Sequence, residues 1–573
     1  MIEKKKKHIR ESNSEEDDLL GVNAPTIEYD TFLTAAGDFG LYQCMMFFCV
    51  GPFYIFGAFV YFSQLFMTEV SPNHWCWIPE LQNLSEFERR SLAIPDDLNS
   101  RFGYSHCQAY VANWSEVLEN GLNPNSSWPI SSCQNGWEFN KTEIPYPTIS
   151  SELGWVCDGR SNQAKAQSIF FIGSIIGGFL IGLFADRYGR LSAATLSNII
   201  GCSAGVGSIY ARNFTEFAIC RFFVGCSYDN CLMMTYLLIL ETTSPKYRTV
   251  MANLSFAVFY TTGVTSLPWI ALACGHWKTL CLATSIPLAS ALLAHFILPE
   301  SPTWLLSKGR VDETVKKIMT IAKVNKKEIS PKMVMQFKLT VAQQTDPEKA
   351  SLIDLLRRPI LRKLFIISCI QFVCSMLIFD LSTRTINQLK YDFFLSFTFI
   401  SLTEFPSLVL ISFILDPVGR RWLTIVVMLI CAVFSILTPL IPNSIASVVC
   451  AVISRFTINM TANTATQWVA EVLPTAVRGS GAATVHICAY MASVISPFIA
   501  HLDSIAYWLP FAFISCIASL CAILAFLLPE TANKEMPQTF EAAETLMREK
   551  DLWFFPWNKN NESKSVNDIF EMN

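Results

Sequence analysis

The sequence predicts an all-α membrane protein with twelve transmembrane helices, arranged as two six-helix bundles of related structure. Of its 573 residues, 51% are hydrophobic and only 16% are charged. The apolar residues gather into runs of about 20, the length that crosses the core of a bilayer. Several motifs of the first half recur 230 residues later. A net charge of -4 gives no reason to expect nucleic acid as a partner.

The apolar runs divide the chain into two halves. A polar N-terminal tail over 1–37 precedes the first half, 38–299. A basic linker with short amphipathic helices, 300–362, leads to the second half, 363–528, and a polar tail over 529–573 follows. Because the chain begins with a Lys run and not an apolar segment, we expect no cleavable signal peptide. The expected spans are 38–66, 164–185, 191–211, 216–241, 250–274, 278–299, 363–384, 393–415, 422–442, 444–471, 479–501 and 505–528.

A polar insertion over 68–160 separates the first two spans. Its cysteines are Cys76, Cys107, Cys133 and Cys157, and its Asn-X-Ser/Thr sequons begin at Asn83, Asn113, Asn125 and Asn140. An even number of cysteines beside several sequons indicates a loop that faces the lumen and later the cell exterior. We therefore expect an extracellular loop with two disulfides, for which three pairings remain open. The other fifteen cysteines lie in the expected spans, where thiols usually serve as small hydrophobes.

A charged motif after the second span, Gly182 to Leu191, returns after the eighth span. Four landmarks keep the same offset of 230 residues, which indicates two copies of one unit. Internal duplication in a membrane protein is typical of transporters. The recurring positions are Asp186, Gly189 and Arg190 with Asp416, Gly419 and Arg420; Glu241 and Arg248 with Glu471 and Arg478; and Pro299-Glu300-Ser301 with Pro529-Glu530-Thr531.

Basic residues in the short loops set the expected orientation. They all fall on the side of the membrane that also carries both tails, so this side is predicted to be cytosolic. These residues are Arg187, Arg190, Lys246, Arg248, Arg420, Arg421 and Arg478.

These motifs resemble those of the major facilitator superfamily and, more narrowly, of its organic cation, anion and zwitterion carriers. Besides the repeated loops, the resemblance rests on Tyr29-Asp30, on Pro299-Glu300-Ser301-Pro302 and on Glu404-Phe405-Pro406. It extends from about residue 29 to 540. It implies two bundles that rock around a central cavity, and a small organic ion as the substrate.

The repeated loops have a mechanical interpretation. Asp186 can accept hydrogen bonds from backbone N–H groups at a facing helix start, and Arg187 and Arg190 can pair with acids such as Glu241. Such contacts would hold an inner gate shut. The alternative is that the basic residues only set the topology. The predicted gating residues are Asp186, Arg187, Arg190, Glu241, Arg248, Asp416, Arg420, Glu471 and Arg478.

Ionisable residues inside the spans are candidates for substrate binding, because an unpaired charge is costly in lipid. Asp229 and Glu404 lie near the midplane, where carriers bind their substrates. Asp380 lies near the outer end of its span, and Arg384 one turn later favours a salt bridge for it. Glu404 has Arg455 as a candidate structural partner.

Asp229 is the preferred cation-binding group. Its carboxylate would attract an ammonium, and the rings of Tyr228 and Tyr236 would add cation-π contacts. The alternative is a structural ion pair with Arg221 or Arg455.

The resemblance relates individual residues of this chain to positions in the family's substrate pocket. In the eleventh span, Tyr490 stands where cation carriers of the family typically have Asp and where anion and carnitine carriers have Arg. Gln371 replaces a pocket tryptophan, whereas Ser255 and Asn463 match other pocket positions. With no Arg at position 490 and with acids in the fourth and seventh spans, we expect cationic or zwitterionic amines to be preferred over anions.

The prediction is a plasma-membrane secondary carrier of small organic cations or zwitterions, embedded in the lipid bilayer and driven by gradients or by a coupled ion. No enzyme motif, cofactor fingerprint or metal-ligand spacing is present in the sequence. The rivals are a sugar-type or organic-anion carrier and a receptor that does not transport. Nothing in the sequence indicates an oligomeric state.

Overall fold

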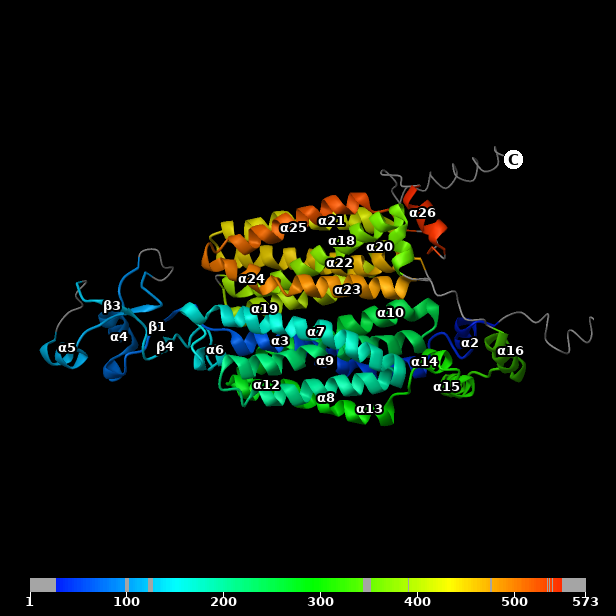
Figure 1. Ribbon diagram of the computed structural model, residues 1–573, viewed down its shortest axis with the longest axis horizontal. Helices are drawn as coiled ribbons and strands as arrows, with labels where there is room; N and C mark the ends of the chain where they lie inside the picture. Colours follow the sequence, from blue (N-terminus) through cyan, green and yellow to red (C-terminus); the bar gives the residue numbers. More distant parts are fainter. Residues whose placement is uncertain are drawn as a thin grey trace, which may run out of the picture.

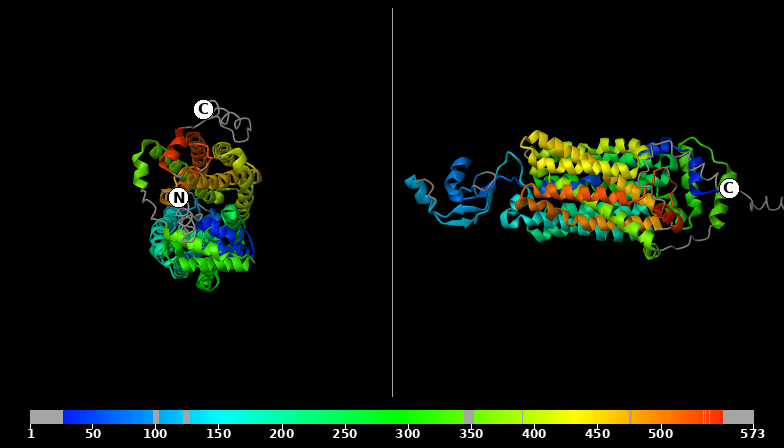
Figure 2. Two further views of the ribbon diagram at one scale, coloured as in Figure 1. Left: turned by 90° about the vertical axis from the view of Figure 1, so that its right-hand side faces the viewer. Right: turned by 90° about the horizontal axis from the view of Figure 1, so that it is seen from above.

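The structure is a computed structural model. It describes residues 27–97, 103–121, 127–343, 352–389, 391–474, 477–532, 534, 536–537 and 539–548. Two helical halves lie side by side, and a small globular segment projects from one end (Figure 1, Figure 2). We call this end the outer end and the opposite one the inner end.

The N-terminal half holds six spans. The second half of the fifth span begins with a π-helical turn, a feature that is frequent at functional sites. The elements are α3 (Leu41–Thr68), α7 (Ser161–Tyr188), α8 (Arg190–Ser208), α9 (Phe214–Thr242), α10 (Pro245–Ser255) with η3 (Phe256–Tyr260) and α11 (Thr261–Cys274), and α12 (Trp277–Ser285) with η4 (Ile286–Ser290) and α13 (Ala291–Ile297).

The C-terminal half repeats this plan. Its α22 has 29 residues, as α9 does, and starts 230 residues after it. The elements are α18 (Pro359–Arg384) with η5 (Ile386–Gln388), α19 (Phe393–Leu402) with α20 (Glu404–Val418), α21 (Arg420–Leu440), α22 (Ser444–Val472), α23 (Arg478–Ser493) with α24 (Ser496–Ala500) and η7 (His501–Ser504), and α25 (Leu509–Leu527).

Within the described ranges, eleven helical segments are long and apolar enough to cross a membrane. The remaining element of the twelve is α8, which has 19 residues and is rich in Ala, Gly and Ser. It lies in the N-terminal half against α9. The predicted all-α fold of two six-helix bundles is confirmed.

Small residues allow close packing in the N-terminal half. A Cβ atom added to Gly173 or Gly177 of α7 would lie 2.1 Å or 2.3 Å from a backbone oxygen of α9. Added to Gly225 of α9, it would lie 2.0 Å from the Phe170 oxygen. Such contacts are typical of helix pairs in membranes.

The outer segment is held by two disulfides, Cys76–Cys133 and Cys107–Cys157. Two antiparallel strand pairs, three short α-helices and two 3₁₀-helices complete it. They are β1 (His74–Cys76) with β4 (Trp137–Phe139), β2 (Gln108–Tyr110) with β3 (Ile130–Ser132), α4 (Glu86–Ala93), α5 (Trp114–Asn120), α6 (Ile149–Glu152), η1 (Pro79–Leu81) and η2 (Cys157–Gly159). The sequon residues Asn83 and Asn113 are exposed and Asn140 is half-buried, whereas Asn125 lies outside the described residues.

Short helices cover the inner end. They are α2 (Tyr29–Ala35), α14 (Pro302–Ser307), α15 (Val311–Val324), α16 (Pro331–Gln343), α17 (Leu352–Arg357) and α26 (Phe540–Arg548). Phe32 of α2 stacks on Phe337 of α16 at 4.5 Å between ring centroids. The N-terminal segment therefore packs onto the linker.

Candidate functional site between the halves

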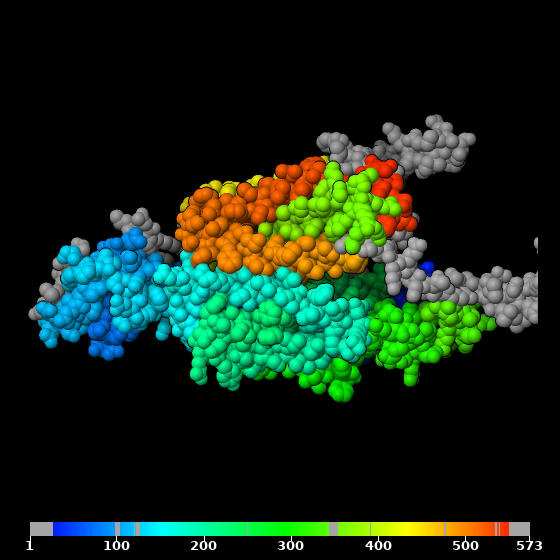
Figure 3. Space-filling view, in the orientation of Figure 1, coloured from blue at the N-terminus to red at the C-terminus, as the bar shows by residue number. Residues whose placement is uncertain are grey.

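Contacts between the two halves concentrate toward the outer end. Phe66 of α3 packs against Phe393 and Phe397 of α19, with ring centroids 5.4 Å and 4.9 Å apart. Ser168 of α7 donates a hydrogen bond of 2.7 Å to the Val494 oxygen. Toward the inner end, Figure 3 shows a recess between the halves in which α10 comes into view. This conformation is therefore closed at the outer end.

Asp229 lies at the middle of α9, on the boundary between the halves. Tyr490 of α23 donates a hydrogen bond to Asp229 Oδ1 across this boundary, with an O···O distance of 2.6 Å. No lysine or arginine of the described ranges forms an ion pair with this carboxylate. The alternative that Asp229 pairs with Arg221 or Arg455 is wrong, because Arg221 Nε donates to Gln64 and Arg455 binds elsewhere.

Aromatic rings surround this carboxylate. Tyr228 packs 5.0 Å from Tyr61 and 6.5 Å from Tyr490, measured between ring centroids. On α23, His486 stands one turn before Tyr490 and contacts the Phe372 ring at 4.7 Å. Carboxylate and ring faces together form a surface suited to an organic cation.

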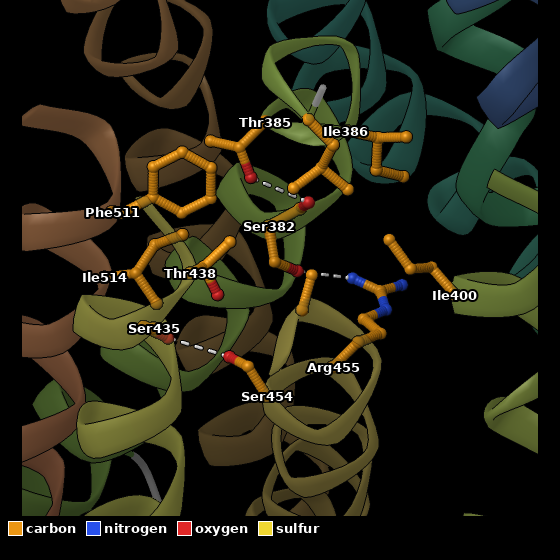
Figure 4. Close-up of a pocket in the computed structure, with 12 residues that line it drawn as sticks. Ser382, Thr385, Ile386, Ile400, Ser435, Thr438, Ser454, Arg455, Phe511 and Ile514 are labelled. Atoms are coloured by element: carbon orange, nitrogen blue, oxygen red, sulfur yellow. Dashed lines mark hydrogen bonds between the residues drawn. The ribbon is translucent and has the colours of Figure 1, made fainter. Parts of the chain in front are cut away.

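Glu404 and Arg455 form a buried ion pair inside the C-terminal half. Arg455 Nη2 lies 3.1 Å from Glu404 Oε1, and both side chains are less than 5% exposed. The other terminal nitrogen, Nη1, donates to Ser382 and Thr383 of α18, whereas Nε is buried without a partner. Figure 4 shows Arg455 at the edge of a small hydroxyl-lined cavity, with its bond to Ser382 dashed. The ion pair thus neutralises Glu404, although its Oε2 atom stays buried without a partner.

Asp380 is fully engaged. Arg384 binds both its oxygens at 2.9 Å, and the hydroxyls of Tyr61 and Ser496 also donate to it. In this conformation the carboxylate offers no free oxygen to a ligand. The structure therefore supports the salt bridge with Arg384 over substrate binding by Asp380, and Tyr61 joins this salt bridge across the halves.

The remaining candidate pocket residues differ in their burial and in the hydrogen bonds that they already make. Gln371 is 2% exposed, and neither its amide nitrogen nor its amide oxygen has a partner, so its contact with a polar ligand stays a prediction. Tyr236 is half-buried. The Ser255 hydroxyl bonds back to the Met251 oxygen, and Asn463 Nδ2 to the Asn459 oxygen. Ser255 is fully buried in this conformation, so its role as a substrate contact stays a prediction.

The sequence analysis missed Tyr61 and His486. His486 is ionisable and lies within the eleventh predicted span, so the filter for polar residues in apolar runs would have found it. Tyr61 is not charged, so the same filter would not have found it. Within the described ranges, no group of His, Cys, Asp or Glu side chains is arranged to hold a metal ion.

The predicted gate of the N-terminal half is an ordered cluster at the inner end. Glu300, just after α13, accepts hydrogen bonds from the N–H groups of Arg190 (2.8 Å) and Leu191 (3.2 Å) at the start of α8. Gly189 has a φ of 106°, and an added Cβ would lie 2.3 Å from Glu300 Oε2. A glycine is therefore needed for the carboxylate to reach this helix start. Arg190 pairs with Asp186 at 2.7 Å.

The C-terminal half contains the same cluster with more ion pairs. Glu530 accepts from the N–H groups of Arg420 and Arg421, both at 2.9 Å. Arg420 binds Asp416 at 2.8 Å and Glu471 at 2.7 Å.

The pairing expected between Arg190 and Glu241 is wrong in the first copy. Glu241 instead accepts a hydrogen bond from Ser301, and Arg187 lies over the Tyr188 ring. Of the other predicted gate residues, Arg248 of α10 pairs with Asp30 of α2 at 2.8 Å, and Arg478 Nε donates to the nearby Leu473 oxygen. None of these contacts joins the two halves, so in this conformation they stiffen each half and its flanking segments and do not tie the halves together.

The profile of the family described as "Sugar (and other) transporter" matches residues 130–543. The chain belongs to this transporter family.

Curated relatives of this transporter include the carcinine transporter of Drosophila melanogaster, 28% identical over 536 residues, with 90% of this chain and 79% of that protein covered. The organic cation transporter protein of the same organism is 29% identical over 532 residues, with 90% and 94% covered. Mouse organic cation/carnitine transporter 2 is 27% identical over 529 residues, with 90% and 93% covered. The resemblance to organic ion carriers of the major facilitator superfamily is confirmed.

The solved structures support the fold of this transporter. The inward open conformation of the xylose transporter XylE from E. coli aligns with a TM-score of 0.57 at 16% identity, covering 88% of this chain and 99% of that one.

Proposed function

We propose that this transporter carries small organic cations or zwitterionic amines by alternating access. The observation that carries the proposal is Asp229, an acid at mid-depth between the halves whose hydrogen-bond partner is the neutral Tyr490 hydroxyl. Its negative charge is available to an ammonium when the neighbouring His486, which also acts on it electrostatically, is neutral.

The other charged residues of the site also favour a positively charged substrate over an organic anion. Arg455 and Arg384, which an organic anion would need, already bind Glu404 and Asp380. The rings of Tyr61, Tyr228 and Tyr490 can contact the organic part of a cation. The relatives named for carcinine, β-alanine and organic cations favour the same substrate class.

The proposal extends to the membrane orientation. Short loops rich in Lys and Arg lie at the inner end, which we infer to be cytosolic with both termini. The disulfide-bearing segment then faces the exterior of the plasma membrane. Antibody access to a tag on either terminus in intact cells would contradict this orientation, whereas access only after permeabilisation supports it.

Uptake in oocytes tests the substrate class. We expect labelled tetraethylammonium or β-alanine to accumulate above mock-injected cells, and labelled para-aminohippurate and xylose not to accumulate. Asp229→Asn should reduce cation uptake, whereas Asp312→Asn, on the exposed linker, should not. Uptake of para-aminohippurate that ignores Asp229→Asn, with no cation or zwitterion uptake, would overturn the proposal. A receptor would bind its ligand without any flux.

A further inference from the structure

A second polar cleft lies at the outer end, where the two halves meet. It has a volume of about 90 Å³. The end of α3 and the start of α7 form its N-terminal wall, and η5, α24 and η7 form its C-terminal wall. This is room for several water molecules or for a molecule of amino-acid size.

Five of the residues that line this cleft each have a buried polar atom without a hydrogen-bond partner. These atoms are Gln163 Nε2, Gln167 Nε2, Asn387 Oδ1, Gln388 Oε1 and Asp503 Oδ1. Each buried polar atom without a partner costs about 1 to 3 kcal/mol. Their concentration around one small cleft indicates that a polar ligand or bound water supplies their missing hydrogen bonds.

The unpartnered atoms are sorted by half. The C-terminal wall presents three acceptors, and the rest of each side chain is already engaged. Asn387 Nδ2 donates to Glu69 at 3.1 Å, Gln388 Nε2 donates to the Ala500 oxygen at 3.2 Å, and Asp503 Oδ2 accepts from Arg160 at 2.8 Å. These contacts fix the free oxygens as acceptors, which suits an ammonium group.

The unpartnered atoms of the N-terminal wall are donors, and its Glu69 carboxylate already accepts from Asn387 Nδ2. Gln163 and Gln167 stand one turn apart on α7 with free amide nitrogens, and Gln167 is only 4% exposed. Arg160 adds a guanidinium at the same end of α7. Amide and guanidinium donors suit a carboxylate.

We propose that this outer cleft is a second binding site, separate from Asp229, for a zwitterion of amino-acid size. Its carboxylate lies against Gln163 and Gln167, and its ammonium against Asn387, Gln388 and Asp503. Because the bound molecule spans both halves while the outer end is closed, it stabilises that conformation. External zwitterion therefore slows the return of the carrier to the outward-open state and lowers the maximal rate of uptake.

Binding to the purified full-length chain in lipid nanodiscs tests the site, with labelled β-alanine as the probe. The double variant Gln167→Leu with Gln388→Met removes one donor and one acceptor at nearly constant volume. In the Asp229→Asn background, which removes the central site, we expect β-alanine to bind at least about tenfold more weakly to the double variant, since each lost bond to a charged group is worth about one tenfold step. The exposed-glutamine control Gln82→Leu and the central variant Asp229→Asn should keep outer-site binding.

Fragments of the probe test the two ends of the site. Propionate lacks the ammonium and ethylamine lacks the carboxylate, so each should compete at least about tenfold more weakly than β-alanine. Equal competition by either fragment would contradict a zwitterion site.

Three results would overturn the proposal. The first is an unchanged β-alanine affinity in the double variant, and the second is the loss of all binding in Asp229→Asn alone. The third is a higher thermal midpoint of the unliganded double variant with unchanged binding, which would mean that the cleft holds only water. If the double variant does not fold, Gln163→Leu alone should weaken binding several-fold. Failure of the central site would instead appear as normal outer binding without uptake.

Discussion

The two halves share one frame but use their charges differently. In the C-terminal half, the membrane acids Glu404 and Asp380 are neutralised by arginines of the same half. In the N-terminal half, Asp229 has a neutral partner from the other half, and Arg221 binds Gln64. Duplication therefore preserved the scaffold, whereas the free acid for a substrate lies in the N-terminal half.

The inner clusters show the same contrast. In both halves a glutamate 110 residues after the arginine caps the start of a helix, Glu300 for Arg190 and Glu530 for Arg420. Only Arg420 also binds a buried glutamate, Glu471. The C-terminal half is thus held more firmly by its own ion pairs.

The largest expected effect is on the buried pair of the C-terminal half. Arg455→Met leaves Glu404 buried without a countercharge, which costs about 3 to 5 kcal/mol of stability. The matched N-terminal variant, Arg221→Met, leaves no carboxylate behind and should cost about 1 to 2 kcal/mol. The thermal midpoint and the surface yield of the full chain measure both. Adding Glu404→Leu to Arg455→Met should restore stability; equal losses in the two single variants would contradict the comparison.

The inner clusters should differ in the same direction. Arg420→Ala leaves Glu471 buried, whereas the Asp186 partner of Arg190 is 71% exposed. We expect a loss of about 3 kcal/mol for Arg420→Ala and of less than about 1 kcal/mol for Arg190→Ala. Thermal unfolding of the detergent-solubilised chain reports the difference. A larger loss for Arg190→Ala would reverse the assignment of the firmer half.

Variants of the two acids separate binding from stability. Asp229→Asn should lower kcat/KM for tetraethylammonium about 10- to 100-fold with a normal thermal midpoint, because a charge–ligand contact is worth about 1.5 to 3 kcal/mol. Asp380→Asn should instead lower the thermal midpoint. Tyr490→Phe should have a smaller effect than Asp229→Asn, since the charge remains. Unaltered tetraethylammonium uptake in Asp229→Asn would place the cation site elsewhere.

The smallest expected effect concerns Glu69, where the halves meet at the outer end. Burial raises the pKa of Glu69 from 4.5 to about 7, against the opposing effects of the Asn387 hydrogen bond and of Arg160. Nearby Asp503 also raises this pKa. The closed outer end therefore binds a proton more tightly than an open end, where the carboxyl group would be exposed. Closure is favoured fully below pH 4.5 and loses this contribution as the pH rises through about 7.

External acid should accordingly hold the outer end closed. We expect uptake to fall by a few-fold between pH 8 and pH 5.5, and Glu69→Gln to flatten most of this dependence. His501 and Asp503 line the same cleft and would leave a residual slope. A pH profile that is identical in Glu69→Gln would exclude this carboxyl group as the cause.

Sequence patterns determine the local elements and their duplication. Apolar runs locate the spans, the 230-residue offset identifies the paired loops, and a charge in an apolar run singles out Asp229. The four cysteines were recognised, but their pairing as Cys76–Cys133 and Cys107–Cys157 required the fold. The Asp380–Arg384 pair was predictable because the two residues are one turn apart on the same helix. The hydrogen bond from Tyr61 to Asp380 was not predictable, since the two residues lie in different halves.

By itself, the sequence determined which segments enter the membrane, that they form two copies of one unit, and which acids lie at mid-depth. Only the tertiary structure decided which of those acids is free. The hydrogen bond from Tyr490 to Asp229 joins residues 261 positions apart, and the five unpartnered atoms of the outer cleft come from both halves. Helical periodicity fixes the direction of a side chain on its own helix, but its neighbours depend on how tightly helices distant in the sequence pack.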